Sequence, residues 1–240
     1  MLHSALKPIA AWLVSLITLG APPGRPQYEP AARESIVQAE ERYQGIAEAI
    51  AEVAFNPKET PVSGNRTFTA ALLAALAYHE SGFRRDVDLG IGRALLAKSG
   101  WNDFGRSWCM MQLQLGAVPL PTELSSSLSK SKGWAVTHNS HAKTTEGWSG
   151  LELLEDRNKC FTAGLHVVQR SIGSCKHLRQ LDWLRSYASG NCTDGASHSA
   201  LRMRTAIRWA RKAPGTWRDA DVVKSLTDDQ SSDTSLVAAH

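Results

Sequence analysis

The chain has 240 residues, of which 42% are hydrophobic and 21% are charged, and its formal net charge is +4 at pH 7. This length and composition are ordinary for a globular protein and are sufficient for one well-buried domain with additions at its ends. The mild positive charge suits an anionic polymer as partner, but no block of Lys and Arg is interleaved with aromatic residues, so nucleic acid is not a predicted partner.

The first 21 residues have the pattern of a targeting segment. Lys7 precedes an apolar run, Ile9–Leu19, which is too short to span a bilayer comfortably. We therefore predict a signal peptide over residues 1–21 and a periplasmic or secreted protein. A proline directly after Ala21 disfavours cleavage there, so a retained membrane anchor is an alternative. A buried N-terminal helix is disfavoured, because a proline-rich linker, residues 22–30, follows.

The rest of the chain is predicted to be all-α, because apolar residues recur at three- and four-residue steps and no convincing two-residue alternation occurs. Ser149 and Glu152 form a capping box at the start of one predicted helix. The predicted helices cover residues 30–55, 67–79, 151–172, 177–188 and 197–212. Residues 31–218 are expected to form one domain, and residues 219–240 a disordered tail.

The four cysteines, Cys109, Cys160, Cys175 and Cys192, include no C-x-x-C pair, which argues against a zinc site. Four cysteines allow three disulfide connectivities. We favour Cys175–Cys192 as a local link and, by exclusion, Cys109–Cys160. Two disulfides would fit an oxidising compartment such as the periplasm, and four buried reduced thiols are the alternative.

Glu80 stands out because it ends an apolar helical run that begins at Ala70. Burial disfavours the charged form of a carboxyl group, and so does the negative end of a helix dipole. The pKa of Glu80 is therefore expected to be raised. A carboxyl group that stays protonated near neutral pH is what the cleavage of a glycosidic bond requires as general acid. The alternative is a solvated glutamate at a frayed helix end.

Four short motifs in order resemble those of the soluble lytic transglycosylase family, within the lysozyme-like superfamily. His79–Phe83 is similar to the family's E-S-x-F signature, and Cys109–Gln112 resembles its G-L-M-Q segment. Leu154–Ser171 resembles its D-x-x-x-N-I-x-x-G-x-x-Y-L helix, and Tyr187–Gly190 its Y-N-A-G element. Together the motifs lie within residues 68–209.

The resemblance implies a lysozyme-like fold and an enzyme that cleaves peptidoglycan glycan strands without a cofactor or metal. It implies that Glu80 is the catalytic acid, which protonates the bond between N-acetylmuramic acid and N-acetylglucosamine and then acts as base. The muramic C6 hydroxyl then attacks, so that a 1,6-anhydro end forms. It also implies that Ser81, Gln112 and Tyr187 line the substrate cleft.

Several departures from the family pattern leave alternatives open. Glu80 and Gln112 are 32 positions apart, farther than in compact family members, which indicates an insertion within residues 86–106. Cys109, Met110 and Ala188 replace the family's Gly, Leu and Asn. A goose-type lysozyme-like hydrolase is one alternative, and its second carboxylate would come from Asp86, Asp88 or Asp103, although we expect solvated loop charges there. The other is a non-catalytic wall-binding or secretion-system protein, whose partner the sequence does not identify.

Overall fold

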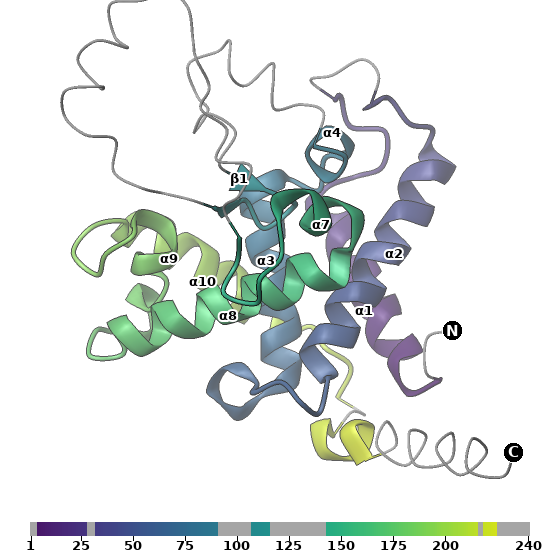
Figure 1. The fold of residues 1–240 in the computed structure, drawn as a ribbon. Coiled ribbons are helices and arrows are strands. Elements are labelled where there is room, and N and C mark those ends of the chain that lie inside the picture. Colours follow the sequence, from purple (N-terminus) through teal and green to yellow (C-terminus); the bar gives the residue numbers. More distant parts are fainter. Residues whose placement is uncertain (1–3, 28–31, 91–106, 116–142, 216–217, 225–240) are drawn as a thin grey trace, which may run out of the picture.

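The computed structural model describes residues 4–27, 32–90, 107–115, 143–215 and 218–224. These residues are mostly helical, which confirms the mainly-α prediction. Helix α3 (Arg66–Ser81) lies in the middle of the molecule (Figure 1). Helices α1 (Lys7–Gly20) and α2 (Ile36–Phe55) lie on one side of it, and α9 (Arg185–Ser189) and α10 (Ala196–Ala210) on the other.

Helix α3 is the core helix of the fold. Asn65 caps its start, because its side-chain oxygen accepts the backbone N–H of Phe68 at 2.6 Å. Each residue from Ala70 to Ala77 is at most 1% exposed, on every face of the helix. A helix that is apolar all round is stable only when neighbours cover all its faces, and the small alanines let those neighbours approach closely. The last turn of α3, with Glu80, is therefore carried into the interior.

Helix α2 begins later than predicted, at Ile36 rather than near Pro30. The reason is a capping box that the sequence analysis overlooked: Gln38 N–H donates to the hydroxyl of Ser35, and the Gln38 side chain accepts the Ser35 N–H at 2.9 Å. Most of the apolar residues that predict this helix are buried, whereas Ile36 in its first turn is 59% exposed.

The helix predicted over residues 151–172 is two helices, α7 (Gly150–Glu155) and α8 (Arg157–Cys175). The break is at Asp156, which has an extended backbone and whose carboxylate accepts the first N–H groups of α8. An Asp within a helical pattern thus acts as a cap that starts a new helix. The predicted capping box of Ser149 and Glu152 is present at the start of α7.

The remaining elements are short. The helix predicted over 177–188 is a 3-10 turn, η4 (Gln180–Asp182), followed by α9, whereas α10 agrees with the prediction for 197–212. Two more 3-10 turns, one short helix and an antiparallel hairpin are also described: η1 (Ser4–Leu6), η3 (Val62–Gly64), α4 (Arg85–Asp88), β1 (Ser107–Trp108) and β2 (Leu113–Gln114).

Both favoured disulfides are present. Cys109–Cys160 joins the hairpin to α8, with a Cα–Cα distance of 6.2 Å, and Cys175–Cys192 joins the end of α8 to the segment after α9, with 5.5 Å. The segment that follows β1 and the loop after α9 are therefore both fixed covalently to α8.

The separation of residues 1–21 from the domain is not what the structure shows. Helix α1 packs against both α2 and α3, and Ile9, Leu13 and Ile17 are fully buried. Helix α1 thus forms part of the core, in agreement with the disfavoured alternative of a buried N-terminal helix. Among the described residues, no helix combines the length and apolar character needed to cross a membrane. Export itself stays a prediction.

The proline-rich linker also differs from the expectation of a free connection. Arg25 donates to the carbonyl oxygen of Gly82 at 3.0 Å, and the Gln27 side chain accepts the N–H of Arg85 at 2.9 Å. Side-chain hydrogen bonds therefore attach the described part of the linker to the end of α3 and to the first residue of α4. Composition alone does not reveal these contacts.

The disordered tail was predicted to begin at residue 219, but the first residues of that range are helical. Residues 219–224 are helical, and the carboxylate of Asp219 accepts hydrogen bonds from the N–H of Arg66 at 2.8 Å and from the hydroxyl of Thr67 at 2.6 Å. Asp219 thus satisfies free donors at the start of α3. Residues 225–240 lie outside the described part of the chain.

The packing of α1 can be tested with two identical substitutions in that helix. Leu13→Ala removes a fully buried side chain and is expected to lower the free energy of unfolding by about 2–5 kcal/mol. Leu19→Ala changes a side chain that is 60% exposed and is expected to change it by less than about 0.5 kcal/mol. Urea denaturation of the 240-residue protein measures both, and equal values would contradict the core position of α1.

Candidate active site

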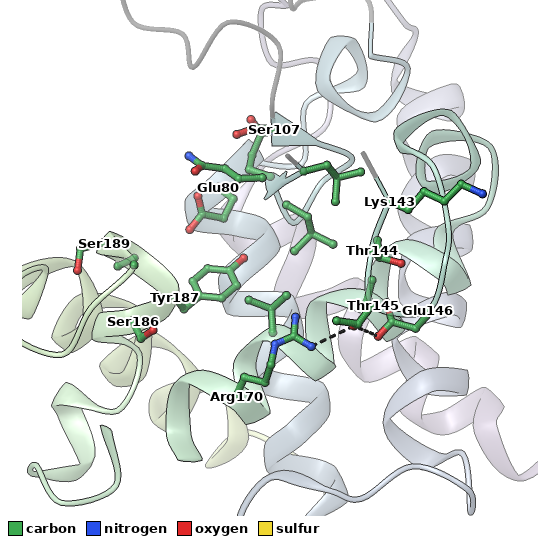
Figure 2. Close-up of a pocket in the computed structure, with 18 of the residues that line it drawn as sticks. Glu80, Ser107, Lys143, Thr144, Thr145, Glu146, Arg170, Ser186, Tyr187 and Ser189 are labelled. Atoms are coloured by element: carbon green, nitrogen blue, oxygen red, sulfur yellow. Dashed lines mark hydrogen bonds between the residues drawn. The ribbon is translucent and has the colours of Figure 1, made fainter. Parts of the chain in front are cut away.

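A cavity of about 630 Å³ opens beside the end of α3. Its walls come from the last turn of α3, the hairpin, residues 143–146, α8, α9 and α10 (Figure 2). Of the four predicted site residues, Glu80, Gln112 and Tyr187 line this cavity and Ser81 does not. The structure thus brings together three residues that lie far apart in the sequence.

Glu80 is held by Arg202 of α10. Both Nε and Nη2 of Arg202 donate to Oε1 of Glu80, at 2.8 and 2.6 Å, and none of the described hydrogen bonds ends on Oε2. The side chains are 18% and 11% exposed, so the pair is largely shielded from water. Burial raises the pKa of Glu80, whereas Arg202 and, more weakly, His198 oppose that rise. The pKa of Glu80 is therefore raised, as expected, but Arg202, which the prediction did not include, makes the rise smaller.

Ser81 has a structural role instead of the predicted contact with substrate. It is 4% exposed, its hydroxyl donates to the carbonyl oxygen of Ala77 at 2.6 Å, and it accepts the N–H of Phe83 at 3.1 Å. Gly82 ends the helix with φ of 60°, a left-handed conformation that glycine adopts without steric cost. The E-S-G-F turn therefore fixes the end of α3, and with it the direction of Glu80.

A buried arginine secures the same turn from outside. Arg42 of α2 donates to the carbonyl oxygen of Phe83 at 2.9 Å and pairs with Glu34 through two hydrogen bonds of 2.8 and 2.6 Å. Phe83 itself is 1% exposed and has φ of 53°, which is unusual for a residue with a side chain. The backbone after Glu80 is thus held in a constrained conformation by contacts from α2.

Gln112 lies at the end of the turn between β1 and β2. Its side-chain amide donates to the carbonyl oxygen of Cys109 at 2.8 Å. The turn is attached to α8 through the disulfide of Cys109, and Met111 packs on Gly164, where a Cβ atom would lie 2.7 Å from the Met111 methyl group. Gly164 belongs to the third motif, so its presence there has a packing reason.

Tyr187 connects α9 to the same turn. Its hydroxyl donates to the carbonyl oxygen of Met111 at 2.7 Å, and its N–H donates to Ser171 at 2.9 Å. Burial, together with the negative charge of Glu80, raises the pKa of Tyr187 well above its usual value. The phenol therefore stays protonated, and its hydrogen is engaged by the backbone.

The cavity also contains an acidic residue that the sequence analysis did not single out. Glu146 lines it on the side opposite Glu80 (Figure 2). Its carboxylate contacts Nδ1 of His166 at 2.5 Å and accepts the hydroxyl of Thr145 at 2.8 Å. The other ring nitrogen of His166 contacts Glu59 at 2.9 Å. His166 thus lies between two carboxylates, which outweigh the effect of burial and raise its pKa. Despite desolvation, hydrogen bonds from His166, Thr144 and Thr145 lower the pKa of Glu146 to about 2.

Asp86 and Asp88, two of the aspartates considered as a second carboxylate, do not line this cavity. Asp86 is fully buried and paired with Arg84, and Asp88 is 6% exposed and paired with Arg157 at 2.6 Å. The expectation of solvated loop charges is therefore wrong for both, because each carboxylate is compensated by an arginine. Asp103 lies outside the described residues.

Arg202 and Glu146 were missed for different reasons. Arg202 lies partly buried on the amphipathic helix α10. A cation on the core-facing side of a predicted helix is the sequence signal that could have indicated it. Glu146 stands in the polar stretch 119–147, which has no periodic pattern, so only the fold relates it to the cavity.

Comparisons with protein-family models, with curated proteins and with solved structures found no match. The family resemblance therefore rests on the four motifs and on the side chains that the fold gathers around Glu80. Within the described ranges, no group of three or more His, Cys, Asp or Glu side chains is arranged to hold a metal ion.

Replacing Arg202 by methionine tests the electrostatic balance at Glu80. The substitution removes the cation that favours the carboxylate and leaves burial, so the pKa of Glu80 is expected to rise further. Carbon NMR titration of the Glu80 carboxyl measures the shift. Arg204→Met, at an exposed position of the same helix, is the control and is expected to leave the pKa of Glu80 unchanged. A fall in the Arg202→Met protein would contradict the assignment.

Proposed function

We propose that this protein cleaves peptidoglycan glycan strands as a lytic transglycosylase on a lysozyme-like fold, with Glu80 as its acid. The observation that carries the proposal is a shielded carboxyl group with a raised pKa at the wall of a cavity that also includes Gln112 and Tyr187. A cavity of about 630 Å³ is within the range of small-ligand sites and accommodates part of a glycan strand.

The first step is proton donation by Glu80 to the oxygen between N-acetylmuramic acid and N-acetylglucosamine. Because Arg202 occupies Oε1, we assign the proton to Oε2, on which none of the described hydrogen bonds ends. As the bond between the anomeric carbon and that oxygen breaks, Glu80 becomes a carboxylate, and the guanidinium of Arg202 stabilises the new charge. Arg202 thus stabilises the product of proton transfer at a site that burial keeps weakly acidic.

The second step closes the anhydro ring. The muramic C6 hydroxyl attacks the anomeric carbon, and its proton passes to the Glu80 carboxylate, which restores the acid. One carboxyl group therefore acts first as acid and then as base, the reversal of role that retaining glycosidases also use.

The neighbours of Glu80 have positioning roles in this proposal. The Gln112 amide nitrogen is engaged by the turn, so its carbonyl oxygen is the group that can accept the N–H of an N-acetyl substituent. The Tyr187 hydroxyl donates to Met111 and holds the turn close to Glu80. Ser81 acts through the helix end and is assigned no contact with the substrate.

Hydrolysis is the second candidate function, and Glu146 is the observation that favours it. Two carboxyl groups on one cavity, one with a raised pKa and one with a lowered pKa, are typical of glycosidases that use water as nucleophile. The two candidates share the proton donation by Glu80 and differ in the sugar end that they produce.

Glu80→Gln tests the shared step, because the amide keeps the size of the side chain but has no acidic proton. Release of soluble muropeptides from purified peptidoglycan is expected to fall by about 100- to 10,000-fold relative to the unchanged protein. Glu40→Gln, on the exposed face of α2, is the matched control and is expected to keep full activity.

Equal release by the unchanged protein and by Glu80→Gln would refute the catalytic assignment. If neither protein releases muropeptides but both bind peptidoglycan in a sedimentation assay, the non-catalytic wall-binding alternative replaces this proposal.

A further inference from the structure

The side chain that the proposed reaction leaves unexplained is Glu146. It belongs to the short segment before α7, it lines the same cavity as Glu80, and its side chain is 15% exposed. A carboxylate that is mostly withdrawn from water carries a desolvation cost, which here is offset by a specific set of contacts. Those contacts indicate what the group is suited to do.

All described hydrogen bonds to the Glu146 carboxylate favour its ionised form. Nδ1 of His166 contacts Oε1 at 2.5 Å, and the Thr145 hydroxyl donates to the same oxygen at 2.8 Å. Despite desolvation, these hydrogen bonds, with one from Thr144, lower the pKa of Glu146 to about 2, so that this carboxylate is negative at neutral pH. It is a weak base and carries a negative charge at neutral pH.

The described ion pair of Glu146 with His166 does not neutralise it. His166 is shared between Glu146 and Glu59, so the three groups carry one net negative charge when the imidazole is protonated. Arg170 donates to the Thr145 hydroxyl at 3.1 Å, and no ion pair joins it to Glu146 within the part of the chain that the structure describes. Lys143 also lines the cavity, but its side chain is exposed, so its charge is screened by solvent.

We infer that Glu146 is a second catalytic carboxylate, which faces the anomeric carbon and stabilises the positive charge that develops there as the glycosidic bond breaks. Cleavage of such a bond passes through an oxocarbenium-like transition state, in which positive charge appears on the sugar ring. A fixed negative charge on the wall opposite the proton donor stabilises that state more than the uncharged ground state. Glu146 gains and loses no proton in this role, and no bond to it forms.

This inference rests on the proposed function, which it extends by adding a group that the single-carboxylate mechanism does not require. Of the described carboxylates discussed above, only Glu80 and Glu146 line this cavity, whereas Asp86 and Asp88 are compensated by arginines elsewhere. The division of roles follows from the two environments: burial keeps Glu80 a proton donor, and hydrogen bonds keep Glu146 an anion.

Glu59 provides a matched control. It contacts the other nitrogen of the same histidine at 2.9 Å, its side chain is 18% exposed, and it does not line the cavity. Like Glu146→Gln, Glu59→Gln therefore removes one of the two ion pairs of His166, but it removes no charge from the cavity.

The test measures kcat and KM for muropeptide release by the full chain and by both variants, with thermal unfolding as the check on folding. Glu146→Gln is expected to lower kcat by about 100-fold while KM changes by less than about threefold, because the lost interaction is made in the transition state. Glu59→Gln is expected to keep kcat within about threefold of the unchanged protein.

Two outcomes would overturn the inference. If Glu146→Gln keeps kcat within about threefold, the carboxylate takes no part in catalysis. If both variants lose kcat and unfolding temperature equally, the role of Glu146 is structural and acts through His166. Failure of the proposed function is a separate result, because it requires that Glu80→Gln be as active as the unchanged protein or that the unchanged protein release nothing.

Discussion

The burial of α3 on all its faces is the constraint on which the candidate site depends. Neighbouring helices cover the run from Ala70 to Ala77, so the last turn of α3 cannot turn toward solvent without exposing that core. Glu80 is consequently placed in a shielded position, and Arg202 compensates part of the cost. The same packing makes α1 a part of the core, because α1 covers α3 together with α2.

A second set of constraints brings the chain after Glu80 back to it. The Cys109–Cys160 disulfide, the close packing of Met111 on Gly164 and the hydrogen bond from Tyr187 all act on the turn that carries Gln112. These links come from α8 and α9, and the Cys175–Cys192 disulfide joins the end of α8 to the segment after α9. The site is therefore positioned by side chains whose own contacts are satisfied, which is what a preorganised catalytic site requires.

The sequence predicted the parts of this arrangement that are encoded locally. Helical periodicity predicted α3 and α10, and motif order pointed to Glu80, Gln112 and Tyr187, which line one cavity. The helix boundaries were predicted less accurately where a polar side chain interrupts the helical periodicity. Asp156, for example, caps α8 and so divides one predicted helix in two. The roles of Arg202, Glu146 and α1 depend on packing between distant segments, and an apolar N-terminal run has the same composition whether it is a leader or a core helix.

The identity of the released sugar end tests the account most directly, since it reports both that Glu80 cleaves the glycan and which group attacks. Mass spectrometry of the soluble products from purified peptidoglycan distinguishes the two ends. The account predicts 1,6-anhydro muramic ends, and their loss in the Glu80→Gln protein. Reducing muramic ends would contradict the transglycosylase reaction and favour hydrolysis, and the absence of soluble products from the unchanged protein would contradict the assignment of this cavity as an active site.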